Sequence, residues 1–266
     1  MSDMDGVLWR GAEYLPGVTE FFELLGRLGV PYVFATNNSG TEPEAYAARL
    51  RAGGVPGVSA RQVVTSGTVM AEVLSVRYPS GTAVHVLGSP ALKAALEEVG
   101  FVVSDPSAPG DVEVVVVGID TTLTYDKLAL AARRILNGAA FYGTNGDVSL
   151  PTAGGLAPGT GSILAALTAA TGTAPQVVGK PERHIFRSAV HRLGSSPDRT
   201  LMVGDRLDTD VLGAQRSGMR TALLLTGVES PASAAASAVR ADAVFADLPA
   251  LSRAWGAARS APGGDR

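Results

Sequence analysis

The stretch DMDGVLWRG at residues 3–11 places two aspartates, Asp3 and Asp5, two positions apart and follows them with Gly6. On an extended chain, side chains at positions i and i+2 share a face, so the two carboxylates converge on one point. There they repel each other unless a cation or a proton compensates, and Gly6 permits a turn close to a bound ligand. A divalent-cation site and an Asx-turn with solvated aspartates are both compatible with this tetrapeptide.

The composition of the whole chain narrows the classes of function. Of the 266 residues, 46% are hydrophobic and 18% are charged, which is typical of a folded globular protein. The net charge of −3, without a local cluster of basic residues, argues against a nucleic-acid partner. Because the chain has no cysteine, oxygen ligands are its main means of holding a metal. No leader-like segment or membrane-length apolar run is present, so we expect a cytoplasmic protein without a membrane partner.

Strand-like and helix-like segments alternate along the sequence. The β-branched and aromatic runs predict strands at residues 30–36, 112–120, 199–205 and 221–227. Helical patterns cover residues 18–29, 43–54 and 162–172: the first starts after Pro16-Gly17, the second ends in paired glycines, and the third stops at Gly172. This alternation predicts parallel sheets covered by helices on both faces.

Two segments rich in Pro, Gly, Ser and Thr have the composition of hinges. They are RYPSGTA at residues 77–83 and TGTAPQ at residues 171–176. If both are hinges, residues 80–174 form a domain inserted into a core made of residues 1–79 and 175–266.

Three further polar clusters follow predicted strands. ATNNSG at residues 35–40 has the side chains to bind an anion at the end of a strand, or to cap a helix. Lys180, in VGKPE, would be held at a strand end where it can meet a phosphate, although a lone lysine is usually surface charge. VGDRLDTD at residues 203–210 places three aspartates in six positions, which suits a metal ligand and its supporting residues better than a helix cap alone.

These motifs, in this order, resemble the haloacid dehalogenase (HAD) superfamily, and within it subfamily IIA, the NagD-like or p-nitrophenylphosphatase-like group. The resemblance covers nearly the whole chain and includes DMDGVLWRG, ATNNSG, GTNGD, PGTGS, VGKPE and VGDRLDTD. It implies a doubly wound, Rossmann-like parallel-sheet core with an inserted α/β cap of the C2 type. It also implies a hydrolase that acts on small phosphorylated metabolites, and caps of this group can form homodimers.

The resemblance implies a role for each matching residue. Asp3 is similar to the nucleophile that accepts the phosphoryl group, and Asp5 to the acid that protonates the leaving oxygen and then activates water. Asp3, the backbone carbonyl of Asp5, and Asp205 would hold Mg²⁺. Asp208 and Asp210 would orient these ligands without binding the ion themselves.

The remaining matches concern the phosphate and the cap. Thr36, Asn37 and Asn38 match the loop that grips the transferring phosphoryl group, and Lys180 matches the lysine that offsets its charge. Because Asp5 can protonate an alkoxide, the resemblance favours a phosphatase over a dehalogenase. In the cap, three polar residues are candidates for substrate specificity, although an ordinary polar turn explains them equally well: Asn145, Asp147 and Ser149.

The sequence departs from the group in two places. Relatives often have proline where Gly146 stands, and no histidine lies between His85 and His184, which argues against a vitamin B6 phosphate as substrate. Only two residues precede Asp3, whereas a core strand typically has about five. We therefore expect that an upstream apolar strand is missing from this chain.

Other classes of function stay open at this point. A receiver-like signalling module also combines clustered aspartates with a lysine, but it needs only one small domain. A catalytically silent protein that binds a phosphorylated ligand is the other alternative, and the intact pair Asp3 and Asp5 argues against it. His184 and His191 share a helical face, but without a third ligand they predict packing or surface positions more than a metal site.

Overall fold

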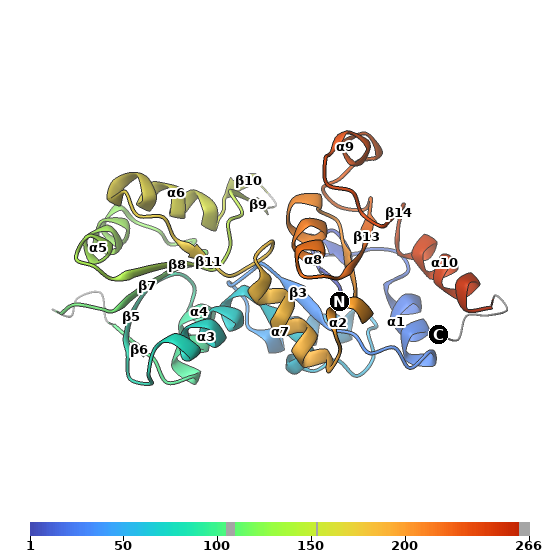
Figure 1. Ribbon diagram of the computed structural model, residues 1–266, viewed down its shortest axis with the longest axis horizontal. Coiled ribbons are helices and arrows are strands. Elements are labelled where there is room, and N and C mark those ends of the chain that lie inside the picture. The colour runs from blue at the N-terminus through green and yellow to red at the C-terminus, as the bar shows by residue number, and fades with distance from the viewer. Residues whose placement is uncertain (105–109, 153, 261–266) are drawn as a thin grey trace. The chain divides into compact units, whose positions relative to one another are not determined.

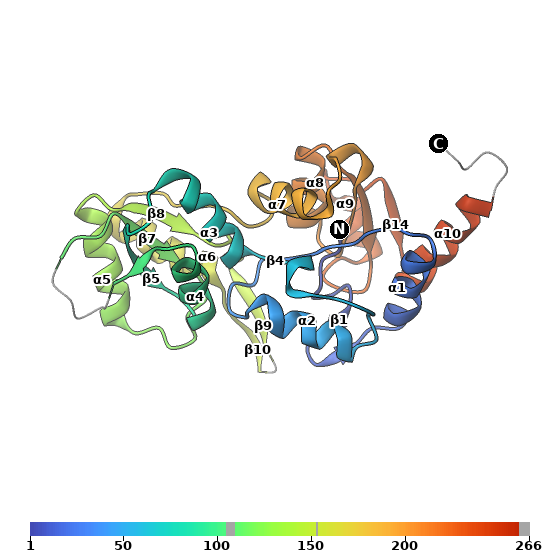
Figure 2. The same cartoon turned by 90° about the horizontal axis from the view of Figure 1, so that it is seen from below.

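A computed structural model describes residues 1–104, 110–152 and 154–260, in which helices and strands alternate (Figures 1 and 2). The chain forms two compact units. The first contains residues 1–35, 44–63 and the described residues from 186 onward, and the second contains residues 36–43 and 64–185. The predicted inserted domain, residues 80–174, lies within the second unit, which extends further along the chain at both ends.

A parallel sheet forms the centre of the first unit. Strand β12 (Leu201–Gly204) pairs with β13 (Arg220–Leu224), and β13 pairs with β14 (Ala243–Phe245). Ser2 makes parallel bridges to Val203 of β12 on one side and to Phe34 of β3 (Phe34–Thr36) on the other. Strand β3 pairs with β4 (Val63–Thr65), and the boundary between the units passes through both strands. The first residues of the chain therefore lie inside a sheet.

Helices cover both faces of this sheet. Ala222 and Leu224 of β13 belong to a core with the helices α1 (Val18–Arg27), α2 (Pro43–Ala52) and α10 (Leu248–Ser260). Leu223, between them, faces the opposite way and packs with Leu207 and Val211, next to α8 (Leu212–Arg216). The other elements of this unit are β1 (Trp9–Arg10), β2 (Glu13–Tyr14), most of α7 (Arg183–Leu193) and α9 (Pro231–Ala236).

The second unit is built on a five-stranded parallel sheet. Its strand order is β11 (Gln176–Val177), β8 (Ala140–Gly143), β7 (Val114–Val117), β5 (Ala83–Leu87) and β6 (Val102–Val103). Helices α5 (Tyr125–Leu136) and α6 (Thr160–Thr171) cover one face, and α3 (Ser66–Arg77) and α4 (Pro90–Glu98) cover the other (Figure 1). An antiparallel hairpin, β9 (Ser149–Thr152) and β10 (Gly155–Pro158), precedes α6.

The sequence predictions for these elements are confirmed, with small changes at their ends. Each predicted strand and helix overlaps the corresponding element, although α6 begins two residues before its predicted range and β13 one residue before. Both predicted hinge segments run from the last residue of a helix to the first residue of a strand. The run predicted at 30–36 forms a strand only from Phe34, and Gly172 ends α6 in the left-handed conformation, at φ 69°. The predicted α/β class with doubly wound parallel sheets is correct.

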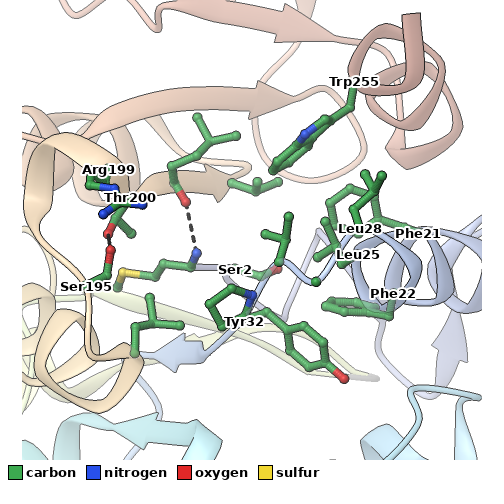
Figure 3. Close-up of a pocket in the computed structure, with 17 residues that line it drawn as sticks. Ser2, Phe21, Phe22, Leu25, Leu28, Tyr32, Ser195, Arg199, Thr200 and Trp255 are labelled. Atoms are coloured by element: carbon green, nitrogen blue, oxygen red, sulfur yellow. Dashed lines mark hydrogen bonds between the residues drawn. The ribbon is translucent and has the colours of Figure 1, made fainter. Parts of the chain in front are cut away.

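A cavity of about 370 Å³ lies beside the first two residues of the first unit. Its lining is mainly apolar and includes Phe21, Leu25, Tyr32 and Trp255 (Figure 3). The amino group of Met1 donates a hydrogen bond to the Leu201 carbonyl at 2.9 Å, and burial lowers its pKa to about 5. None of the helices within residues 1–104, 110–152 and 154–260 is long and apolar enough to cross a membrane.

Candidate functional site

Three buried aspartates gather in the first unit. Asp3 follows Ser2, which pairs with two parallel strands, and Asp205 directly follows β12. Asp3, Asp205 and Asp210 each contribute a carboxylate oxygen that lies within 4.8 Å of the other two. Their exposed fractions are 7%, 2% and 0%, so water cannot compensate three negative charges at this point. The edge formed by the carboxyl ends of parallel strands is the usual place for a ligand in such sheets.

Backbone groups hold two of these carboxylates. Oδ2 of Asp205 accepts a hydrogen bond from the Val228 N–H at 2.8 Å, and Oδ2 of Asp210 accepts from the Asp205 N–H at 3.2 Å. A Cβ atom at Gly6 or at Gly227 would collide with Oδ2 of Asp205. Gly6 also has φ 79°, so a side chain there would be strained as well as obstructed. The two glycines therefore make room for the Asp205 carboxylate.

The cluster fits a hard divalent cation. All three ligand groups are carboxylates, which Mg²⁺ and Ca²⁺ prefer, and a cation removes the repulsion among them. A soft metal would favour sulfur ligands, and the chain has no cysteine. The donor set therefore matches the kind of ion that the sequence predicts.

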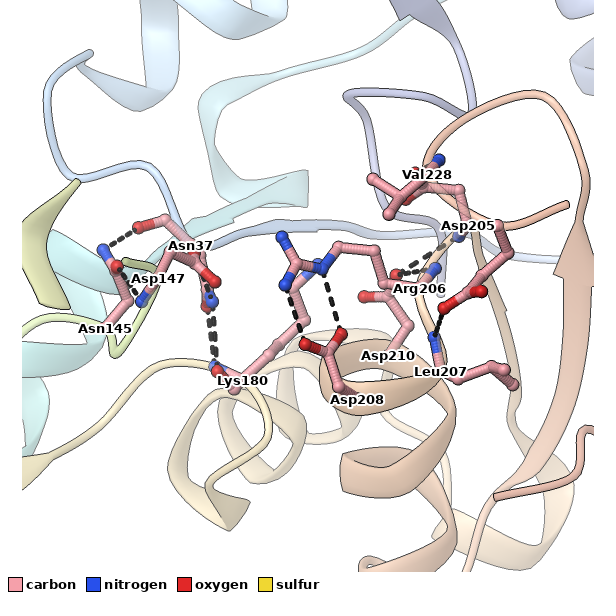
Figure 4. A network of polar contacts seen from close by, with 11 residues as sticks. Asn37, Asn145, Asp147, Lys180, Asp205, Arg206, Leu207, Asp208, Asp210 and Val228 are labelled. Carbon is pink, nitrogen blue, oxygen red and sulfur yellow. Dashed lines mark hydrogen bonds and ion pairs between the residues drawn. The ribbon is translucent and has the colours of Figure 1, made fainter. Parts of the chain in front are cut away.

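The aspartates in the loop after β12 point in different directions. Residues Leu207–Val211 form a π-helical turn, within which Asp210 is buried and belongs to the cluster. The exposed carboxylate of Asp208 instead accepts hydrogen bonds from Nε and Nη2 of Arg206, at 3.0 and 2.8 Å (Figure 4). The Arg206 guanidinium lowers the pKa of Asp208 below its usual value. The structure thus brings Asp210, and not Asp208, beside Asp3 and Asp205.

The carboxylate of Asp5 lies apart from this cluster, and a tryptophan orients it. Asp5 is exposed, and its Oδ1 accepts a hydrogen bond from Nε1 of Trp9 at 2.9 Å. Trp9 is fully buried, and its ring stacks on Tyr46 with the centroids 6.3 Å apart. The Arg49 guanidinium carbon lies 3.9 Å from the centroid of the Trp9 ring. Trp9 was not among the predicted site residues, although its position in the short turn after Asp5 was the available signal.

The predicted phosphate loop belongs to the second unit and is strongly hydrogen-bonded. Oγ1 of Thr36 accepts from the Asn38 N–H at 3.1 Å, and Oδ1 of Asn38 accepts from the Gly40 N–H at 2.6 Å. The backbone carbonyl of Asn37 accepts from Oγ of Ser66 at 2.5 Å. These contacts make residues 36–40 a fixed turn.

Asn37 connects this loop to two other predicted site segments (Figure 4). Its Oδ1 accepts a hydrogen bond from the Lys180 N–H at 2.7 Å, and its Nδ2 donates one to the Lys180 carbonyl at 3.0 Å. Its Nδ2 also donates to Oδ2 of Asp147 at 2.9 Å, and Nδ2 of Asn145 donates to the Asn37 carbonyl at 2.7 Å. Lys180 is buried, with 3% of its surface exposed. Ser149, the third predicted cap residue, begins β9 of the hairpin.

Both histidines predicted to share a helical face lie on α7. His184 is partly buried and His191 is exposed. Neither belongs to a group of three metal-ligating side chains in the described part of the chain.

Comparisons with known proteins agree with this architecture. A family model described as haloacid dehalogenase-like hydrolase matches residues 1–102, and a HAD-hydrolase-like model matches residues 177–251. The 5′-nucleotidase YutF of Bacillus subtilis is 39% identical over 226 residues, which are 85% of this chain and 86% of that protein.

Two solved phosphatases have the same fold. The p-nitrophenyl phosphatase from Archaeoglobus fulgidus superposes with a TM-score of 0.89 at 30% identity, over 96% of this chain and 97% of that one. The glycerol phosphate phosphatase Rv1692 from Mycobacterium tuberculosis, solved in complex with magnesium, gives a TM-score of 0.85 at 34% identity, over 94% of this chain and 75% of that one.

Proposed function

The chain belongs to the haloacid dehalogenase-like hydrolase family, and on that premise we propose that it is a Mg²⁺-dependent phosphatase of small phosphomonoesters. The observation that carries the proposal is the buried cluster of Asp3, Asp205 and Asp210. Three carboxylates on the edge of a parallel sheet suit a cation that neutralises a phosphoryl group during its transfer. The magnesium complex of the glycerol phosphate phosphatase supports the choice of metal.

In this proposal the two aspartates that open the chain perform the chemistry. An oxygen of Asp3 attacks phosphorus, the bond from phosphorus to the ester oxygen breaks, and an aspartyl-phosphate forms. Asp5 donates a proton to the leaving oxygen and then takes a proton from the water that hydrolyses the aspartyl-phosphate. The hydrogen bond from Trp9 to Asp5 would hold that carboxyl group in a fixed direction.

Other groups of the proposed site bind the phosphoryl group and offset the negative charge that it shares with Asp3. Asp3, Asp205 and Asp210 would hold Mg²⁺, which lowers the repulsion between the Asp3 carboxylate and the phosphate. The Thr36 hydroxyl and the backbone N–H groups of its loop would bind the phosphoryl oxygens, and the Lys180 ammonium would balance their charge. No covalent step requires a further cofactor.

The substrate is proposed only as a class. The similar proteins act on a nucleotide, on p-nitrophenyl phosphate and on glycerol phosphate, which share a phosphomonoester and differ in the leaving group. Asn145, Asp147 and Ser149 stay candidates for contacts with that leaving group. Sugar phosphates and phosphoglycolate belong to the same class and should be assayed beside the others.

The test measures phosphate release from p-nitrophenyl phosphate and from a panel of phosphomonoesters, with Mg²⁺ and with EDTA. We expect turnover that EDTA abolishes, and we expect Asp3→Asn to lower kcat by roughly three orders of magnitude or more, as the loss of a covalent nucleophile does. Asp198→Asn, at an exposed aspartate of the same unit, is the matched control and should keep full activity. A folded wild type that binds phosphate esters without turnover would instead favour the binding-protein alternative.

A further inference from the structure

The side-chain amide of Asn37 has no hydrogen left to offer a phosphate. A primary amide has two N–H donors. One donates to Oδ2 of Asp147 at 2.9 Å, and the other donates to the backbone carbonyl of Lys180 at 3.0 Å. The amide oxygen accepts the Lys180 N–H at 2.7 Å, and an oxygen acceptor repels an anion. The match to the phosphate-gripping loop therefore does not hold for this side chain.

The two contacts with Lys180 hold its backbone from both sides. Asn37 pairs with the N–H and the C=O of one residue, as a neighbouring strand would. The preceding Gly179 donates its N–H to the Thr144 carbonyl at 2.8 Å. A Cβ atom at Gly179 would lie 2.6 Å from both Oδ1 of Asn37 and the Thr144 carbonyl oxygen, so a side chain at this position would displace the Asn37 amide or the Thr144 backbone. The direction in which the Lys180 side chain leaves the backbone is fixed by these contacts.

The same amide reaches the loop between β8 and the hairpin. Asp147 accepts from Nδ2 of Asn37, and its own N–H donates to Oδ1 of Asn145 at 3.1 Å. Nδ2 of Asn145 donates in turn to the Asn37 carbonyl. Asn37 and Asn145 are both more than nine-tenths buried, so a lost hydrogen bond would leave a polar group without water. A change in the shape of residues 145–147 would therefore be transmitted to Asn37.

We propose that Asn37 is a positioning residue for Lys180, and that Asp147 keeps its amide in the orientation that clamps the lysine backbone. The inference rests on the proposed function for the role of the Lys180 ammonium. It assigns Asp147 to the control of Lys180, in addition to any contact with a leaving group. Nothing in it requires Asn37 to touch the substrate.

A double-mutant cycle tests whether Asn37 affects catalysis through Lys180. We expect Asn37→Ser to lower kcat/KM about 30-fold in the wild-type background, because misplaced catalytic groups lose about that much, and less than about threefold in a Lys180→Gln background. Asn137→Ser, at an exposed asparagine that ends α5, is the matched control and should change neither value. Losses from Asn37→Ser and Lys180→Gln that simply multiply would show that Asn37 acts on the substrate by itself, and would overturn the proposal.

A second measurement does not depend on activity. The chain has three lysines, Lys93, Lys127 and Lys180, so a protein with ¹³C-labelled lysine gives three sets of side-chain signals, which Lys93→Arg and Lys127→Arg assign. We expect the Lys180 signals to shift or broaden in Asn37→Ser and in the milder Asp147→Asn, while the other two lysines stay unchanged. A Lys180 spectrum unchanged in both variants would contradict the clamp, even if the wild type has no phosphatase activity. If Asn37→Ser does not fold, Asp147→Asn alone decides.

Discussion

At the scale of single residues, the orientation of the exposed Asp5 carboxylate depends on the buried side chain of Trp9. The Asp5 carboxylate lies at the surface, where a free side chain would sample several rotamers. The indole N–H of Trp9 restricts it, and the Trp9 ring itself contacts Tyr46 and the Arg49 guanidinium. A large aromatic residue thus supplies one hydrogen bond with little freedom of its own.

We expect Trp9→Phe to lower kcat with little change in KM, because the ring still fills the core but no longer orients Asp5. A decrease of roughly tenfold is reasonable for the loss of one orienting hydrogen bond. Steady-state kinetics on p-nitrophenyl phosphate measure the effect. Tyr46→Phe removes a hydroxyl from the neighbouring ring without touching Asp5, and is the control. An unchanged kcat in a folded Trp9→Phe variant would show that Asp5 needs no orientation from Trp9.

Residue identity predicted the candidates well but not the directions of their side chains. Three aspartates at positions 205, 208 and 210 are equivalent in a sequence pattern. The π-helical turn of residues 207–211 decides which of them faces Asp3, and its pitch cannot be inferred from composition. Asn37 was equally ambiguous, since its neighbours in space, Lys180 and Asp147, lie more than a hundred positions away along the chain.

At the scale of elements, the periodic segments were predictable and the pairing of the first residues, 1–3, was not. The valine run of β7 and the glycine that ends α6 follow local rules for strands and helix ends. Residues 1–3 are too few to show any period, yet Ser2 pairs on both sides within a parallel sheet. Pairing with distant strands, and not local propensity, determines their conformation.

Burial of the Met1 amino group makes the stability of the first unit depend on pH. The folded pKa is about 5 and the ordinary value is 8.0, so between these values the unfolded chain binds a proton that the folded chain does not. The free energy of unfolding therefore falls as the pH falls from 8 to 5, and this contribution levels off below pH 5. We expect a loss of about 2 kcal/mol between pH 8.5 and 6.5.

Urea unfolding at these two pH values, with and without acetylation of the Met1 nitrogen, tests this expectation. An acetyl group removes the charge, keeps the N–H that donates to Leu201, and lies beside the cavity of Figure 3. His85 also has a lowered pKa, about 4, because of burial, and it acts in the same direction, mainly below pH 6.5 and in both proteins. Equal pH slopes for the acetylated and unmodified chains would show that the amino group is not buried as a neutral amine.

At the scale of the whole molecule, the predicted site residues fall in both units of the chain. The carboxylate cluster and Asp5 belong to the first unit, whereas the Thr36 loop, Lys180 and the polar residues 145–149 belong to the second. The predicted domain bounds placed the Thr36 loop and Lys180 in the core, residues 1–79 and 175–266, and only residues 145–149 in the inserted domain, whereas in the structure all of them belong to the second unit. A homodimer formed through the cap stays a prediction, and sedimentation velocity that finds only a monomer at assay concentrations would contradict it.

Metal binding should stabilise the unit that carries the cluster. Mg²⁺ that binds the folded chain and not the unfolded one adds about 2.7 kcal/mol at a concentration one hundred times its Kd. For a chain of this size we expect a rise in Tm of roughly 5–10 °C, since each kilocalorie shifts Tm by about 2–4 °C. Asp205→Asn keeps an oxygen that can accept the Val228 N–H but removes one charged ligand, so it should lose most of the Mg²⁺-dependent rise.

Differential scanning calorimetry with Mg²⁺ and with EDTA measures this rise, and Asp208→Asn separates the cluster from the rest of the acidic loop. Its carboxylate is engaged by Arg206 and exposed, so its loss should leave the Mg²⁺-dependent rise in Tm unchanged. Equal losses in Asp205→Asn and Asp208→Asn would mean that Mg²⁺ acts through the general charge of the loop. In that case the cation is attracted by diffuse electrostatics, and the three buried carboxylates need another explanation for their proximity.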